Sequence, residues 1–393
     1  MTPTYELRRE PIILSFEEKA AFTETYGFVG SQGYVFLEGQ RLLPEGHDSD
    51  TVLIFMHPAS TLNLMPLPAA LARAGHHVIC GASRYAKNDA PLIMEKVVAD
   101  LGAYVRHARE DLGYRTVVLC GWSGGGSLAT FYQSQAEAPT ITHTPAGDVY
   151  DLTRAGLQPA DALMFIAAHT GRARILAEWI DPSVRNELDP DDCDPALNLY
   201  GGQIEPPYTA GFVATYRAAQ RARVRRITEH ALDTLDRLKA RGGAEVERPF
   251  LVHRTMADPR FLDPTLEPND RRPGWCYLGN PETANNGPAG LARFTTLRAW
   301  LSQWSPDHSR ADAEACIKTV TVPLLVVENS ADDAVPTAHP RCVFDAATTK
   351  DKTYHRINGA THYYKDQPTH QSYAVNLITQ WLQNRRFAGQ AEA

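Results

Sequence analysis

The sequence lacks the features that would assign it to a membrane, secreted or nucleic-acid-binding class. No apolar run is long enough to cross a bilayer as a helix. The net charge is −7, whereas binding to nucleic acid or to an anionic membrane surface needs a basic face. Residues 1–10 carry no apolar segment, so we expect no signal peptide and a cytoplasmic protein.

Cysteine is scarce as well. The six cysteines are scattered and form no Cys-x-x-Cys pair, which argues against both a zinc site and a disulfide framework. Cys80 and Cys120 end apolar runs and are predicted to be buried thiols. This cysteine usage is typical of a protein in a reducing compartment.

Short apolar runs alternate with helical patterns in the first part of the chain. Strands are predicted at residues 51–56, 77–80, 116–120 and 161–168. Helices with a period near 3.6 are predicted between them, at about 64–73 and 89–112. This alternation forms parallel crossovers, so we expect an α/β protein with a mostly parallel sheet covered by helices on both faces. A β-hairpin within residues 26–43 is expected to extend the edge of the sheet.

The pattern changes between residues 171 and 320. A helix rich in arginine and alanine is predicted at 211–241, and a second helix at 290–304 carries leucine and tryptophan at i, i+3 and i+4. Only residues 249–253 are predicted to form a strand here. This part of the chain is therefore predicted to be mainly helical.

The apolar strand pattern returns at 322–327. We therefore predict that residues 1–170 and 321–393 form one core, and that residues 171–320 are a cap inserted between two of its strands. An independent domain over the same residues is the alternative.

One turn in the core carries a candidate nucleophile. An apolar strand leads into Gly-Trp-Ser-Gly-Gly at 121–125, and residues 127–132 read as a helix. A serine at such a turn is forced toward φ > 0, and the flanking glycines remove the Cβ atoms that would clash. The hydroxyl of Ser123 is then lifted clear of the sheet, above the positive end of the helix.

Two loops later in the chain supply an acid and a base. A strand at 324–327 is followed by Asp-Asp-Ala-Val-Pro at 332–336, and a short strand near 354–357 is followed by Asn-Gly-Ala-Thr-His at 358–362. Histidine titrates near neutrality, so it can take the serine proton and return it to a leaving group. A carboxylate fixes its tautomer and stabilises the imidazolium.

These motifs resemble those of the α/β-hydrolase superfamily, in particular its serine esterases and lipases. The order Ser123, Asp332, His362 is the chain order of that fold. The resemblance selects Asp332 because it stands two residues before a Val-Pro pair. We expect its neighbour Asp333 to point to solvent, since a second buried carboxylate would repel the first. The resemblance covers about half of the chain and implies no cofactor and no metal.

An oxyanion hole needs two backbone donors. Gly124 follows the nucleophile and is predicted to supply one N–H group. Relatives often carry His-Gly-x after the strand that ends near residue 56, whereas this chain has His-Pro-Ala at 57–59. Proline has no N–H group, so Ala59 is the matching donor, with Ser60 as a fallback. His57 either holds this loop by hydrogen bonds or takes part in the reaction.

Five residues are predicted to contact a substrate. They are His57, Trp122, His169, Trp275 and Tyr277. The last two lie in a loop of the cap that is rich in proline and glycine, and we expect at least one of them to come near Ser123.

The resemblance implies a carboxylesterase-like serine hydrolase. It would cleave a carboxylic ester, thioester or lactone of a small, fairly apolar molecule through an acyl-enzyme on Ser123. Carbon–carbon bond hydrolysis and acyl transfer by the same three residues stay open, as does a non-catalytic receptor for a small molecule. We expect neither nucleic acid nor membrane as a partner, and a homodimer stays open.

Overall fold

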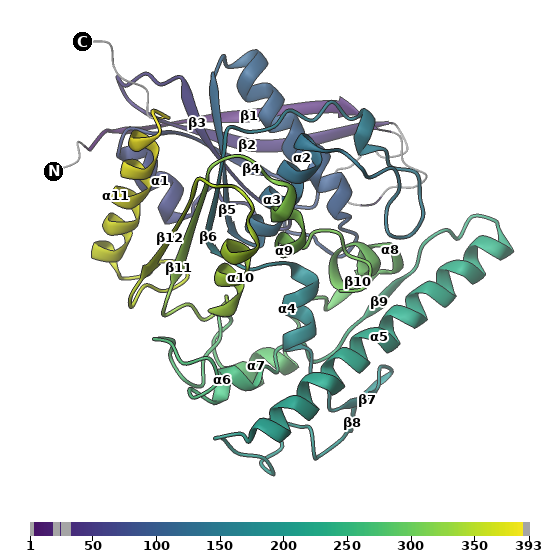
Figure 1. Cartoon of the computed structure of the whole chain (residues 1–393). Helices are drawn as coiled ribbons and strands as arrows, with labels where there is room; N and C mark the ends of the chain where they lie inside the picture. Colours follow the sequence, from purple (N-terminus) through teal and green to yellow (C-terminus); the bar gives the residue numbers. More distant parts are fainter. Residues whose placement is uncertain (1–3, 19–23, 25–32, 388–393) are drawn as a thin grey trace.

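The computed structural model describes residues 4–18, 24 and 33–387, and its centre is an eight-stranded sheet (Figure 1). The strands lie in the order β1-β2-β4-β3-β5-β6-β11-β12. They are β1 (Leu7–Glu17), β2 (Tyr34–Pro44), β3 (Thr51–His57), β4 (His77–Ala82), β5 (Thr116–Ser123), β6 (Ala162–Ala168), β11 (Leu324–Asn329) and β12 (Lys352–Ile357). From β4 to β12 in this order neighbouring strands are parallel, and β2 joins β4 antiparallel. The predicted mostly parallel sheet is therefore confirmed.

The central strands are buried on both faces. Every residue of β3, β4, β6 and β11 is buried. A parallel sheet shows this pattern when helices cover both of its sides, because its connections must cross over those faces. The continuously apolar runs in the sequence thus correspond to the middle of the sheet.

The edge of the sheet differs from the prediction. A hairpin was expected within 26–43, but β2 pairs with β1, which begins at Leu7, in antiparallel register. Residues 26–32 lie outside the described residues. Most of β1 is exposed or only half-buried, although Ile12, Ile13 and Leu14 lie within it. An ion pair between Glu10 and Arg41 helps to hold it to β2.

Helices form a layer on each face of the sheet (Figure 1). The helices α1 (Pro66–Arg73) and α11 (Pro368–Asn384) cover one face. The helices α2 (Met94–Arg106), α3 (Gly124–Glu137), α9 (Ala313–Cys316) and α10 (Ala338–Ala346) cover the other. A π-helical turn, His107–Asp111, continues α2, and two short 3-10 turns cover Leu152–Arg154 and Ile317–Thr319. The predicted helix at 89–112 thus begins five residues later than expected.

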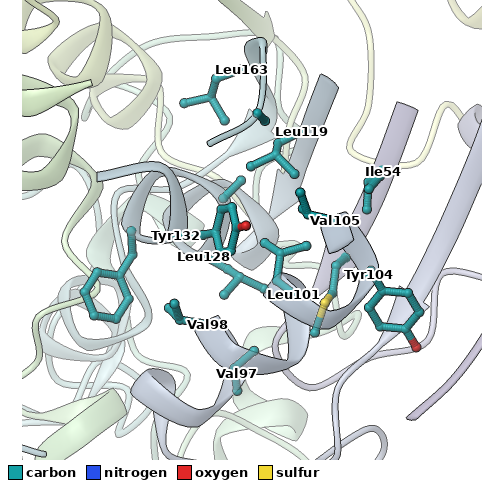
Figure 2. Close-up of a cluster of buried hydrophobic side chains, with 14 of the residues drawn as sticks. Ile54, Val97, Val98, Leu101, Tyr104, Val105, Leu119, Leu128, Tyr132 and Leu163 are labelled. Atoms are coloured by element: carbon teal, nitrogen blue, oxygen red, sulfur yellow. The ribbon is translucent and has the colours of Figure 1, made fainter. Parts of the chain in front are cut away.

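Figure 2 shows the core between the sheet and the pair α2–α3. Leu101 of α2, Leu128 of α3 and Leu119 of β5 are all buried there. Burying a leucine side chain contributes about 2 kcal/mol relative to leaving it exposed. This packing fixes the start of α3 against the end of β5, where the Gly-x-Ser-x-Gly turn lies.

Between β6 and β11 the chain leaves the sheet and then returns to the neighbouring position, since these two strands pair directly. The longest element of this insertion is α5, capped at its start by the Thr209 side chain and followed by Gly242 at φ +67°. The insertion contains α4 (Arg172–Trp179), β7 (Val184–Asn186), β8 (Asp189–Cys193), α5 (Ala210–Arg241), β9 (Pro249–Leu251), α6 (Pro259–Leu262), α7 (Pro281–Asn286), β10 (Phe294–Thr296) and α8 (Leu297–Ala299). Among the described residues, α5 included, no helix combines the length and apolar character that a membrane span requires.

The predicted helix at 290–304 is wrong in its first half. Residues Phe294–Thr296 form β10 and pair with β9, because their backbone groups bond across this small sheet rather than along a helix. Only Leu297–Ala299 and the π-helical turn Trp300–Trp304 are helical. Trp300 and Trp304 are fully buried in the core of the insertion.

Candidate active site

Ser123 lies at the junction of β5 and α3 and has a strained backbone, with φ +54° and ψ −125°. A non-glycine residue is held at positive φ only when its surroundings enforce it. Here the chain turns so tightly that a Cβ atom at Gly121 would lie 2.5 Å from Gly126 Cα. A Cβ atom at Gly125 would lie 2.4 Å from Met56 O of the neighbouring strand β3. The glycines thus allow the close packing that presents the serine.

We expect Gly125→Ala to destabilise the protein by about 3 kcal/mol, because the new Cβ atom would meet strand backbone that cannot move cheaply. Denaturant unfolding followed by circular dichroism measures this loss. Gly211→Ala is the matched control, because a Cβ atom at Gly211 meets nothing within 4 Å. Equal unfolding free energies for the two variants would contradict this account of the turn.

His362 and Asp332 form a buried pair. His362 Nδ1 lies 2.8 Å from Asp332 Oδ2, and the two side chains are each 2% exposed. The other carboxylate oxygen, Asp332 Oδ1, accepts hydrogen bonds from the backbone N–H groups of Ala334 and Val335, both at 2.8 Å. The carboxylate is therefore fixed, and it orients the imidazole of His362.

Asn329, which the sequence analysis did not single out, holds the two loops together. Its Nδ2 donates to Thr361 O at 2.9 Å, and its Oδ1 accepts from Tyr364 Oη at 3.0 Å. Asn329 ends β11 and pairs with Ile357 at the end of β12. Because both strands are parallel, the loops that carry Asp332 and His362 leave the same edge of the sheet. The strand predicted from the sequence ends at residue 327, so Asn329 lay beyond it and carried no signal of its own.

A cavity of about 300 Å³ lies over the end of β5. Ser123 and His362 both line it, together with Ala334 of the loop that carries Asp332. Residues of the insertion complete the wall, among them Arg172 and Trp179 of α4. The cavity thus brings together the serine from the end of one strand and the histidine from the loop of another.

Solved structures resemble the fold of this chain along nearly its whole length. DcsB, solved in complex with its substrate analogue, matches with a TM-score of 0.50 and 13% identity over 95% of this chain and 99% of its own. The chain has the α/β-hydrolase fold. The siderophore hydrolase EstB from Aspergillus fumigatus matches with a TM-score of 0.47 and 13% identity, over 88% of this chain and 94% of its own. The esterase domain of a Rhodothermus marinus protein matches with a TM-score of 0.46 and 13% identity, over 95% of this chain and 98% of its own. No family model and no curated protein matches the sequence.

Within this α/β-hydrolase fold, the second aspartate differs from the expectation. Asp333 was expected to point to solvent, but it is half-buried and lines a small cleft beside Asp332. Burial, and then the charge of Asp332, raise the pKa of the Asp333 carboxyl. The repulsion expected between the two carboxylates therefore raises the pKa of Asp333 and does not expose its side chain.

Three of the aromatic predictions concern this cavity. Trp122 lines it and also supports the base, since its ring lies 4.4 Å from the His362 ring and its Nε1 donates to His362 O at 3.3 Å. Tyr277 lines it and packs against Trp179, with ring centroids 5.8 Å apart. Trp275 is not among the lining residues, because it packs under the guanidinium of Arg272, 4.2 Å from the ring centroid. Of these two aromatic residues of the insertion, Tyr277 thus lines the cavity that Ser123 also lines.

The loop after β3 differs from a simple oxyanion loop. Ala59 N and Ser60 N both donate to His57 Nδ1, each at 3.1 Å. The backbone N–H groups predicted as the second oxyanion donor are therefore directed at the imidazole. The role predicted for Ala59 would require this hydrogen bond to be shared or broken. Gly124, the other predicted donor, begins α3 directly after Ser123.

One side of the cavity is charged, which the sequence analysis did not predict. Arg172 of α4 forms an ion pair with Asp89 and donates to Gln303 at 2.9 Å, and its guanidinium lies 4.4 Å from the centroid of the Trp304 ring. His169 lies nearby, and burial, followed by the charges of His339 and Arg172, holds its pKa well below the ordinary value. Among the described residues no partner is present for His169 Nδ1.

Buried polar side chains tie α4 of the insertion to the core. His339 of α10 bonds through Nδ1 to Thr170 Oγ1 at 3.1 Å and through Nε2 to Glu178 of α4 at 3.2 Å. Glu178 also pairs with Arg260 of α6, which in turn pairs with the buried Asp258. Removing Glu178, Arg260 or Asp258 would leave a buried charge unpaired, which is strongly destabilising. These contacts fix α4 as a wall of the site.

Proposed function

We propose that this chain is a serine hydrolase with Ser123 as nucleophile, His362 as base and Asp332 as the group that orients the base. The observation that supports it is the buried Asp332–His362 hydrogen bond of 2.8 Å beside a cavity that Ser123 also lines. The arrangement follows the triad principle, in which geometry and roles matter rather than sequence position.

The proposed reaction begins with proton transfer. A hydrogen bond from His362 Nδ1–H to Asp332 leaves Nε2 free to accept the proton of the Ser123 hydroxyl. The serine oxygen attacks the substrate carbonyl, and the tetrahedral intermediate collapses as His362 returns the proton to the leaving oxygen or sulfur. A water molecule, deprotonated by His362, then releases the acid and restores Ser123.

We propose a carboxylic ester, thioester or lactone of a small, fairly apolar molecule as the substrate. The cavity volume of about 300 Å³ is at the lower end of the range for small-molecule sites. Trp122, Trp179, Tyr277 and Leu291 supply apolar surface around Ser123. Such a lining favours an acyl or alkyl group of modest size.

Labelling with a serine-directed fluorophosphonate tests this proposal. We expect mass spectrometry to find one modified residue, Ser123, and no modification in Ser123→Ala. A panel of nitrophenyl esters, thioesters and lactones, each with and without an alcohol acceptor, then separates hydrolysis from acyl transfer. No labelling, together with no turnover above that of Ser123→Ala, would reject the proposal.

We expect Tyr277→Ala to raise KM for a bulky ester about tenfold, which corresponds to about 1.4 kcal/mol of lost contact. KM for the matching acetate should change less than twofold, because a small acyl group does not reach the aromatic wall. Steady-state kinetics on the two esters measure the difference. Trp275→Ala is the matched control, since Trp275 does not line the cavity, and equal effects of the two variants would contradict this assignment of the wall.

A further inference from the structure

We propose that the His57 side chain donates a hydrogen bond from Nε2 to the substrate oxyanion and acts beside the backbone N–H of Gly124. The inference rests on the proposed serine hydrolase function and adds a catalytic residue to it. Oxyanion holes of this fold are built mainly from backbone N–H groups. Here a side chain would replace one of them.

The hydrogen bonds of His57 fix its tautomer. Ala59 N and Ser60 N each donate to His57 Nδ1 at 3.1 Å. A backbone N–H can only donate, so Nδ1 must be the acceptor and carries no proton. A neutral imidazole then has its proton on Nε2, which makes Nε2 a donor.

The ring is also held neutral. Burial, followed by the charges of Arg172 and His362, lowers the pKa of His57 to about 3. Over the working range of most hydrolases His57 therefore does not exchange protons as a base. A neutral N–H donor can stabilise a developing oxyanion without a second buried charge beside His362.

Nε2 faces the turn that carries the nucleophile. An ideal Cβ atom at Gly124 would lie 2.7 Å from His57 Nε2, so the imidazole edge reaches the backbone next to Ser123. His57 lines the same cavity as Ser123 and His362. Among the residues that the structure describes, no hydrogen-bond partner is present for this nitrogen, whereas Nδ1 has two. The donor thus lies beside Gly124, the residue that follows Ser123, and in the cavity that Ser123 lines.

The sequence of the loop explains why a side chain takes this place. Pro58 has no N–H group, and the N–H groups of Ala59 and Ser60 are directed at His57 Nδ1. The loop is held in this form, since Lys87 N donates to Ala59 O at 2.8 Å and Ser83 Oγ donates to Pro58 O at 2.5 Å. The loop backbone thus offers no free donor at these positions, and the imidazole supplies one.

Two substitutions separate a role in catalysis from a role in holding the loop. In His57→Asn the amide oxygen takes the place of Nδ1, so it still accepts from Ala59 and Ser60, but the distal donor is lost. In His57→Gln the amide nitrogen reaches the place of Nε2 and restores a donor. We expect His57→Asn to lower kcat by about 10²–10³, the usual cost of one oxyanion donor, with KM within threefold. We expect kcat of His57→Gln to be at least tenfold higher than kcat of His57→Asn.

A tetrahedral inhibitor gives a second readout. The serine oxygen adds to a trifluoromethyl ketone, and the adduct carries an oxyanion. In His57→Asn the inhibition constant of this ketone should therefore rise by the same factor by which kcat falls. The melting temperature and the shape of the pH–rate profile should stay close to those of the wild type, because the ring does not titrate in the assay range. A purely structural role would instead change melting temperature and KM.

The outcomes distinguish this inference from the proposed function. If the wild type shows no turnover that depends on Ser123, the proposed function fails and the role of His57 fails with it. If the wild type is active and His57→Asn keeps kcat within threefold, only the role of His57 is overturned. If His57→Asn does not fold, His57→Gln decides, because kcat reduced by 10² or more despite the retained donor would also overturn it.

Discussion

Ser123→Ala is expected to lower kcat by about a millionfold, a loss of the size seen when the nucleophile of a serine hydrolase is removed. The fold should be retained, because the strained turn is held by the glycine contacts around it rather than by the hydroxyl. Turnover of the most reactive ester in the panel measures the loss, and circular dichroism checks the fold.

Ser134→Ala is a suitable control for this result. Ser134 is a buried serine of the same helix α3, and its Oγ donates to Phe131 O, away from the cavity. Its turnover should stay within about threefold of the wild type. Near-wild-type turnover by Ser123→Ala would exclude Ser123 as nucleophile and would assign the catalysis to another group.

Asp332→Asn is expected to reduce kcat by about 10⁴. The new amide oxygen would keep the hydrogen bonds from Ala334 and Val335, so its amide nitrogen would face His362 Nδ1. His362 would then accept at Nδ1 and carry its proton on Nε2, the nitrogen that must take the serine proton. Steady-state kinetics on an activated ester measure the loss.

The neighbouring aspartate provides the matched comparison. Asp333→Asn should cost less than about tenfold, because the structure places Asp332, not Asp333, on the imidazole. A larger loss from Asp333→Asn than from Asp332→Asn would show that Asp333 serves the base.

Local patterns explain why much of the core could be predicted from the sequence. A strand buried on both faces is apolar over most of its length, so β3, β6 and β11 are visible as short apolar runs. The turn at Ser123 needs glycines at fixed offsets, and the loops that carry Asp332 and His362 follow directly after strands. Each of these signals lies within about ten residues of chain.

The remaining features depend on contacts between distant segments. The place of β1 in the sheet depends on its pairing with β2, because most of its side chains, that of Ile13 included, are exposed or only half-buried. Trp275 and Tyr277 stand two residues apart, and only the fold decides that one lines the cavity while the other packs under Arg272. Likewise, nothing in the sequence indicates that Ala59 directs its N–H group to His57.

The direct pairing of β6 with β11 has a consequence for how such a protein can diversify. The insertion leaves the C-terminal end of β6 and returns at the N-terminal end of its parallel neighbour β11, so a crossover of another length can replace it without changing the strand order. Loop-closure entropy grows only slowly with length. Ser123, Asp332 and His362 all lie outside the insertion, whereas Arg172, Trp179 and Tyr277 belong to it. Evolution can therefore exchange the wall that selects the substrate while inheriting the proposed chemistry unchanged.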